Sequence, residues 1–220
     1  MCVLICRVGE RPLIGANRDE AYARPFSPPR RWVAETTFWA PRDDEEGGTW
    51  IGVNANGLIA AITNLSRLPE EKGRASRGHL VAGALARADL AAAHAFLERE
   101  LCAAPRNPCQ IFLGQGARGE VCRISPEGHA FDELAPGIHV LSNFHDSDEL
   151  DFGLASDVNL DALRPVLSDT RKNLPRDFAV CKYAGWRGTV SSALIEPGVR
   201  FDFAGGPPDT TAYERVADYP

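Results

Sequence analysis

The chain has 220 residues, of which 44% are hydrophobic and 25% are charged, a composition typical of soluble globular proteins. Its formal net charge of −6 lacks the basic excess that a phosphate backbone attracts, so we expect no nucleic-acid partner. An apolar run over residues 3–6 ends at Arg7, which is too short for a signal sequence or a membrane span, so we expect a cytoplasmic protein without stable membrane insertion.

The first third of the chain is predicted to be β-structure. Apolar alternation and turn residues predict strands over residues 2–8, 13–17, 36–40, 49–54 and 58–64. Residues 18–31 are polar and rich in proline, which favours a loop. The acidic run 43–46 followed by two glycines indicates a turn, and Asn56-Gly57 indicates a hairpin between the last two strands.

The rest of the chain mixes helices with further short strands. Helices are predicted over residues 76–88 and 89–101, capped by Ser76 and Asp89, and over residues 159–167, where Pro165 should bend or end the helix. Strands are predicted over residues 110–113, 120–124, 130–134, 139–141, 189–195 and 199–203. We expect residues 1–220 to form a single α+β domain, with residues 205–220 as a tail on its surface.

Six cysteines occur without a Cys-x-x-Cys pair: Cys2, Cys6, Cys102, Cys109, Cys122 and Cys181. No set of cysteines and histidines has the spacing of a zinc site, so we predict no metal. Cys2 directly follows Met1, and removal of Met1 would give Cys2 a free α-amine beside its thiol. That pair can act as a nucleophile with its own base. On position alone, the favoured interpretation of Cys2 is a cysteine that is simply part of a strand.

The tetrapeptide Asn17-Arg18-Asp19-Glu20, together with other motifs, strengthens the interpretation of Cys2 as a nucleophile. The further motifs are Met1-Cys2, residues 47–52 (Gly-Gly-Thr-Trp-Ile-Gly), residues 56–58 leading to Thr63-Asn64, and residues 141–143 (Leu-Ser-Asn). Together they resemble the NRDE family, also called the transport and Golgi organisation protein 2 family. The family is similar in turn to cysteine N-terminal-nucleophile hydrolases such as penicillin V acylase and bile salt hydrolase.

The resemblance implies a four-layer αββα sandwich and a site that cuts non-peptide amide bonds without a cofactor. Cys2 would be the nucleophile, and Arg18 would lower its pKa by favouring the thiolate. Asp19 would hold the α-amine and Asn64 would donate to an oxyanion. Asn143 would orient the substrate or complete the same site.

Two features depart from the acylase pattern. Arg18 and Asp19 are adjacent, whereas the acylases separate the two residue types, so on a continuing strand these side chains would point to opposite faces. The family segment that carries a site arginine reads Thr189-Val190-Ser191 here, so Val190 stands where an arginine is expected.

The resemblance also leaves a second function open. The wider association of the family with haem trafficking and with acyl-CoA or lipid homeostasis implies a carrier or chaperone of a small hydrophobic cargo, in which haem is a possible ligand. A purely structural protein is the third possibility, and it would leave Cys2, Arg18 and the two asparagines without a role.

Overall fold

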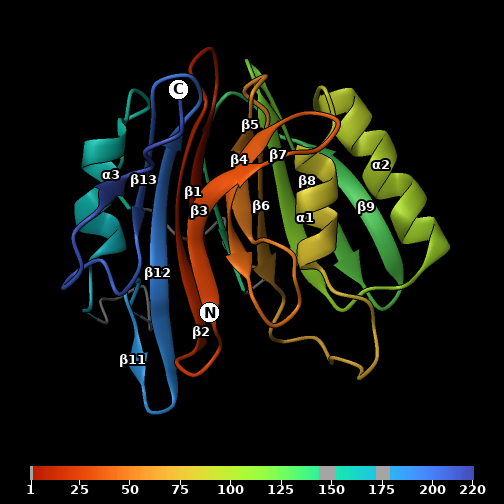
Figure 1. Ribbon diagram of the computed structural model, residues 1–220, viewed down its shortest axis with the longest axis horizontal. Helices are drawn as coiled ribbons and strands as arrows, with labels where there is room; N and C mark the ends of the chain where they lie inside the picture. The colour runs from red at the N-terminus through yellow and green to blue at the C-terminus, as the bar shows by residue number, and fades with distance from the viewer. Residues whose placement is uncertain (1, 144–151, 172–178) are drawn as a thin grey trace.

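Two antiparallel sheets pack face to face, and helices cover both outer faces (Figure 1). The computed structural model describes residues 2–143, 152–171 and 179–220. The first sheet has the order β10-β1-β2-β12-β13-β14, with β11 beside β12. Its strands are β1 (Val3–Val8), β2 (Leu13–Ala21), β10 (Gly137–Ser142), β11 (Tyr183–Ala184), β12 (Arg187–Glu196), β13 (Arg200–Ala204) and β14 (Glu214–Arg215).

The second sheet runs in chain order from β3 to β9. Its strands are β3 (Phe26–Trp32), β4 (Phe38–Asp43), β5 (Ile51–Asn54), β6 (Ile59–Asn64), β7 (Cys109–Gln115), β8 (Arg118–Ser125) and β9 (Gly128–Glu133). Helices α1 (Gly78–Leu85) and α2 (Leu90–Ala103) cover this sheet, and α3 (Leu160–Leu167) covers the first.

Three apolar clusters separate the four layers. The central one lies between the sheets and includes Leu4, Ile14, Ile59 and Phe112. A second fills the space between the second sheet and helices α1 and α2, and a third packs the first sheet against α3. Because both faces of each sheet are covered, the inner strands β1, β5, β7 and β12 are buried along most of their length, which confirms the predicted αββα sandwich.

Alternation along β1 and β2 determines which side chains face the site. Leu4 and Cys6 of β1 and Ile14 of β2 belong to the central cluster, whereas Val3 and Ile5 pack toward α3. Since successive side chains point to opposite faces, even-numbered residues in this hairpin face the second sheet.

Two parts of the expected loop over residues 18–31 are strands instead. β2 continues through the polar tetrapeptide to Ala21, because Arg18 and Asp19 pair with β12. Residues 26–32 form β3 despite Pro28 and Pro29. β3 lies at the edge of its sheet, and its register shifts between Ser27 and Arg30, which is where prolines are tolerated in a sheet.

The helices lie close to their predicted positions. Asp89 caps α2 by accepting from the Ala92 N–H at 2.8 Å, as expected. α1 starts at Gly78, two residues after the predicted cap, and has no side-chain cap. α3 continues through Pro165 to Leu167.

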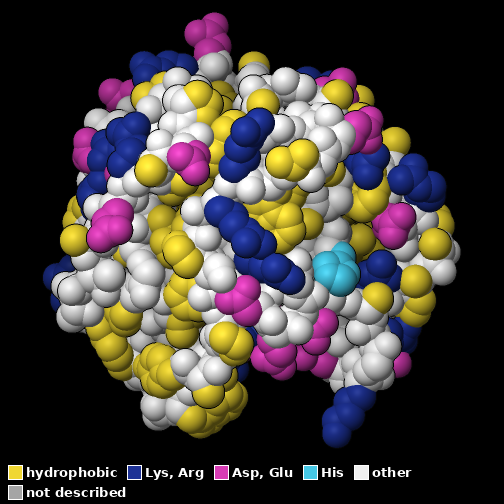
Figure 2. Space-filling model, in the orientation of Figure 1, with side chains coloured by type: hydrophobic (Ala, Val, Ile, Leu, Met, Phe, Trp, Pro, Cys, Tyr) yellow, Lys and Arg dark blue, Asp and Glu magenta, His cyan; other side chains and the backbone are white. Residues whose placement is uncertain are grey.

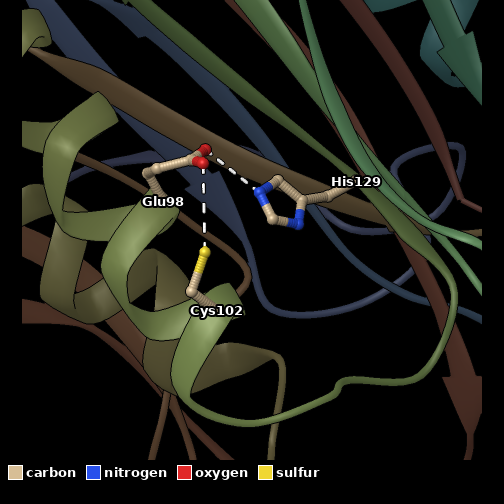
Figure 3. A group of neighbouring side chains, drawn as sticks. All are labelled: Glu98, Cys102 and His129. Atoms are coloured by element: carbon tan, nitrogen blue, oxygen red, sulfur yellow. Dashed lines mark hydrogen bonds and ion pairs between the residues drawn. The ribbon is translucent and has the colours of Figure 1, made fainter.

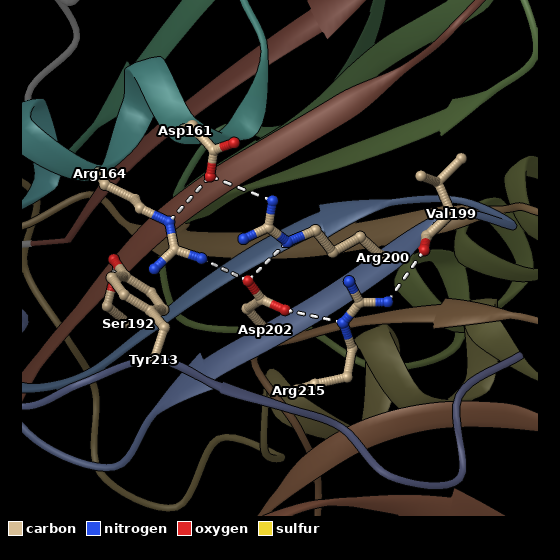
Figure 4. Close-up of polar contacts among 8 residues, drawn as sticks. All are labelled: Asp161, Arg164, Ser192, Val199, Arg200, Asp202, Tyr213 and Arg215. Atoms are coloured by element: carbon tan, nitrogen blue, oxygen red, sulfur yellow. Dashed lines mark hydrogen bonds and ion pairs between the residues drawn. The ribbon is translucent and has the colours of Figure 1, made fainter.

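The C-terminal segment is more than the expected surface tail. It adds β14 to the first sheet, and Val216 and Tyr219 are buried in the central cluster. A buried carboxylate, Asp202, fastens this end of the molecule (Figure 4). It accepts from the guanidinium groups of Arg164 on α3, Arg200 on β13 and Arg215 on β14.

Basic and acidic side chains are interspersed on the face drawn in Figure 2, without a continuous basic track. Among the described residues, none of the helices is both long enough and apolar enough to cross a membrane.

Candidate active site around Cys2

The registers of β1 bring three of the predicted site residues together. Val3 pairs with Asn17 on one side and with Ser142 on the other. One step further along an antiparallel pair, Cys2 comes beside Arg18 and Asn143. By the alternation described above, Cys2 and Arg18 face the second sheet from the same side of the first.

Hydrogen bonds hold the backbone and the thiol of Cys2. The Cys2 nitrogen donates to Oδ1 of Asn143 at 2.6 Å, and Nδ2 of Asn143 donates to the Ser66 hydroxyl at 2.7 Å. The Asp19 N–H points at the Cys2 sulfur, 3.5 Å away. Asn143 therefore occupies the position beside the Cys2 nitrogen that the family resemblance assigns to Asp19.

Arg18 is a buried cation with a fixed orientation. Its Nη2 donates to Oδ2 of Asp43 at 2.6 Å, and its guanidinium lies 4.1 Å from the ring centroid of Trp50. Its Nη1 is buried without a hydrogen-bond partner among the described residues. A buried guanidinium nitrogen without a protein acceptor is uncommon, so Asp43 alone does not satisfy the donors of Arg18.

Asp43 holds this arrangement from the end of β4. It accepts from Arg24 at 2.8 Å and from the backbone N–H groups of Glu45 and Glu46 at 3.1 Å. Burial alone would raise the pKa of Asp43, but these donors and the charge of Arg18 outweigh burial and lower the pKa below its ordinary value. Asp43 therefore stays ionised opposite Arg18.

Asp19 points to the opposite face of β2, as expected for a residue adjacent to Arg18 on a continuing strand. Its Oδ1 accepts from the Thr189 hydroxyl at 2.6 Å, and its Oδ2 pairs with Nζ of Lys182 at 3.0 Å. The register between β2 and β12 shifts between Thr189 and Ser191. Val190 is the extra residue of this bulge and is buried, and the cation beside Asp19 is Lys182.

A pocket of about 240 Å³ opens over the thiol. Cys2, Arg18, Asp19, Asp43, Trp50, Ile62 and Asn64 line its interior side, and Arg74, Arg77, Gly78 and Asn107 line the side toward α1. Asn64 reaches it as the last residue of β6. All five predicted site residues are therefore near one another, although Asn143 contacts Cys2 without lining the pocket.

The pKa of Cys2 departs from expectation. Burial raises the pKa of the thiol and the charge of Asp19 raises it further, while the Asp19 N–H and Lys182 act in the opposite direction. Arg18 does not lower the pKa of Cys2 below its ordinary value, because burial outweighs the nearby cations. In the chain with Met1 in place, Cys2 is thus held as a neutral thiol near pH 7.

The structure adds residues that sequence reasoning missed. Asp43 was part of a run interpreted as a solvated turn, yet it is buried. Trp50 lies in the Gly-Gly-Thr-Trp-Ile-Gly motif, and its ring stacks on Arg18 and lines the pocket. Lys182 has no motif around it, and its partner Asp19 is 163 residues away in sequence. Lys182 could have been noticed only because lysine is rare in this chain, where it occurs at three positions.

Solved structures with the same fold define the structural class of this chain. The structure aligns with penicillin V acylase from Agrobacterium tumefaciens over 99% of this chain and 87% of that chain, with a TM-score of 0.58 and 14% identity. It aligns with the N-acylethanolamine-hydrolyzing acid amidase ortholog of Caenorhabditis elegans over 90% of this chain and 94% of that chain, with a TM-score of 0.60 and 12% identity. Such low identities establish the fold alone, which is N-terminal-nucleophile-hydrolase-like.

The sequence places the chain more narrowly. The family model of Transport and Golgi organisation 2 matches residues 1–151, and the chain belongs to this family. The Transport and Golgi organization protein 2 homolog of Bos taurus is 33% identical over 93 residues, which are 37% of this chain and 34% of the relative. The match thus spans about a third of the length of that relative.

Proposed function

We propose that this chain hydrolyses a non-peptide amide bond, with Cys2 as an N-terminal nucleophile after removal of Met1. The observation that carries the proposal is the meeting, at one pocket, of a thiol, a buried cation with a fixed orientation, and an asparagine at the end of a strand. A nucleophile needs such groups around the carbonyl that it attacks.

Once Met1 is removed, the α-amine of Cys2 would accept the thiol proton, and Sγ would attack the carbonyl carbon of the substrate. Collapse of the tetrahedral intermediate, with the proton passed to the leaving nitrogen, releases an amine and leaves a thioester on Cys2. Water, deprotonated by the same amine, then attacks the thioester and releases the acid. With Met1 in place, burial raises the pKa of the thiol, so removal of Met1 and the free α-amine it creates would be the step that activates Cys2.

The other residues divide the remaining tasks. The side-chain amide of Asn64 would donate to the oxyanion, and Asn143 would fix the α-amine through its 2.6 Å contact with the Cys2 nitrogen. Arg18 Nη1 would donate to the thiolate or to the substrate. Lys182, paired with Asp19, would supply the positive charge that the acylase pattern expects from position 190.

The pocket gives less support to a carrier of haem or of another bulky hydrophobic cargo. About 240 Å³ lies below the usual range of sites for drug-sized ligands. Its described lining is rich in charged side chains, so it is a poor fit for a largely apolar macrocycle. A small substrate with a polar amide end fits this lining better.

The test is hydrolysis of a panel of small N-acyl amides by the purified chain and its variants. Cys2→Ala and Cys2→Ser are expected to lose at least about a thousandfold in rate while keeping the fold. Cys102→Ser is the matched control, because Cys102 is an exposed thiol that does not line the pocket, and it should keep full activity. Hydrolysis that survives unchanged in Cys2→Ala would rule out Cys2 as the nucleophile.

A further inference from the structure

On the opposite side of the second sheet, a carboxylate, a thiol and an imidazole meet between α2 and β9 (Figure 3). Glu98 and Cys102 are four residues apart on α2, and His129 is the second residue of β9. Residues four apart on a helix point the same way, so the helix presents both side chains to the strand. None of the three lines the pocket of Cys2.

The ligand atoms of these three side chains lie within 4.8 Å of one another. Nε2 of His129 is 3.0 Å from one oxygen of Glu98, and Sγ of Cys102 is 3.9 Å from the other. A tetrahedral Zn²⁺ ion with bonds of about 2.0–2.3 Å separates its ligand atoms by about 3.5 Å. Side-chain rotation at the exposed Glu98 and Cys102 would be enough to close the remaining gap.

We propose that Glu98, Cys102 and His129 form a zinc site that fastens α2 to the edge strand β9. The donor set of one thiolate sulfur, one imidazole nitrogen and one carboxylate oxygen suits Zn²⁺ rather than Mg²⁺ or Ca²⁺, which prefer oxygen ligands alone. Binding releases the thiol proton of Cys102 to solvent, and the fourth coordination position is left to water.

The surroundings of the three residues fit this site. The ring of His129 packs edge-on against Phe131, with centroids 6.1 Å apart, which restricts its orientation. His94, one turn before Glu98 on α2, faces the same strand but is bonded to the carboxylate of Glu120 at 3.0 Å. His94 is therefore a matched control, since it is a neighbouring histidine on the same helix that already has a carboxylate partner.

An exposed ion pair between Glu98 and His129 is the simpler explanation of their contact. The two explanations differ in the role of Cys102, because an ion pair needs no thiol four residues along the helix. A probe that reports sulfur coordination therefore separates them.

The experiment titrates Co²⁺ into the full-length chain carrying Cys2→Ala, so that the pocket thiol does not contribute, and follows thiolate-to-cobalt charge-transfer absorption. We expect a band that saturates at one Co²⁺ per chain and disappears when Zn²⁺ is added. Cys102→Ser should abolish the band, and His129→Ala should weaken binding by at least about tenfold, the scale of losing even an outer-shell partner. His94→Ala should leave the affinity unchanged.

Absence of the band at millimolar Co²⁺, or a band that persists in Cys102→Ser, would overturn the zinc site. Circular dichroism of each variant confirms that the fold is kept. Because the measurement is made in Cys2→Ala, its result does not depend on whether the chain hydrolyses amides.

Discussion

At the scale of single residues, the two sides of β2 divide the polar tetrapeptide between two tasks. The Arg18 side chain points toward the second sheet, whereas the side chains of Asn17 and Asp19 point to the opposite face of β2, where Asn17 contacts α3 and Asp19 pairs with Lys182. Nδ2 of Asn17 donates to the carbonyls of Leu167 and Val180, which ties α3 and the following segment to the sheet. The tetrapeptide at residues 17–20 therefore contributes both to packing between the layers and to the candidate site.

Lys182 is the residue whose change tests this division most directly. Asp19 and Lys182 are both largely buried, so Lys182→Met leaves a carboxylate without its cation and should lower the free energy of unfolding by about 3 kcal/mol. Because Lys182 also lowers the pKa of Cys2, its loss disfavours the thiolate, and the pH midpoint for alkylation of Cys2 should move upward.

The check is urea unfolding together with the alkylation rate of Cys2 as a function of pH. Lys72→Met is the control, because Lys72 is exposed, and Lys182→Arg should restore much of both properties because it keeps the charge. Identical alkylation profiles for Lys182→Met and the unaltered chain would show that Lys182 has no electrostatic influence on Cys2.

At the scale of elements, the turn after β4 and the start of α1 build one wall of the pocket by close backbone contact. A Cβ at Gly48 would lie 2.4 Å from the carbonyl carbon of Gly78, so neither the turn nor the helix could stay where it is. The Thr49 N–H also donates to the Gly78 carbonyl at 3.2 Å. Gly48 of the family motif is thus required by packing, whereas Gly47 is favoured by its φ of 79°.

Gly48→Ala is accordingly expected to destabilise the chain by about 1–3 kcal/mol, the range for overpacking, and to displace the start of α1 from the pocket. Gly9→Ala is the matched control, because a Cβ at Gly9 meets nothing within 4 Å. Urea midpoints of the two variants test this, and equal midpoints would contradict the close contact.

Elements that are specified by residues close together in sequence, such as a turn dipeptide or a helix cap, could be predicted from the sequence. The hairpin at Asn56-Gly57 forms as expected, with Gly57 at a φ of 80°. The cap of α2 at Asp89 is likewise local. β3 could not be predicted, because its two prolines argue against a strand. Prolines are tolerated in an edge strand, but the position of β3 at the edge of the sheet is not visible in the sequence.

The candidate site was predictable as a set of residues but not as an arrangement. The motifs brought Cys2, Arg18 and the two asparagines to attention, whereas the ion pair between Asp19 and Lys182 depends on long-range pairing of β2 with β12. The bulge at Val190 shifts that register by one residue, and no local pattern indicates it. The ligand group at α2 and β9 was missed for the same reason, since zinc spacing in sequence does not find ligands that meet only in the fold.

At the scale of the whole molecule, four buried thiols make stability depend on pH. Burial raises the pKa of Cys109 and of Cys181 to about 12, and it also raises the pKa values of Cys6 and Cys122. A thiol whose pKa is higher in the folded state than in the unfolded state contributes stability that is fully present below the unfolded pKa of about 8.5. That contribution is lost as the pH rises toward the folded value.

We therefore expect the free energy of unfolding to fall as the pH rises from about 8.5 toward about 12, by about 1.4 kcal/mol per pH unit for each thiol. Urea titrations at pH 7.5 and pH 10 measure the loss. A free energy of unfolding that stays constant between them would contradict the burial of these thiols.

The central claim, that Cys2 is an activated N-terminal nucleophile, is tested most directly by intact mass of the untagged chain before and after treatment with less than one equivalent of a thiol alkylator. We predict a mass that lacks Met1 and a single label located at Cys2 by peptide mapping, ahead of the exposed Cys102. Retained Met1, or a label found mainly at Cys102 with Cys2 unmodified, would contradict it.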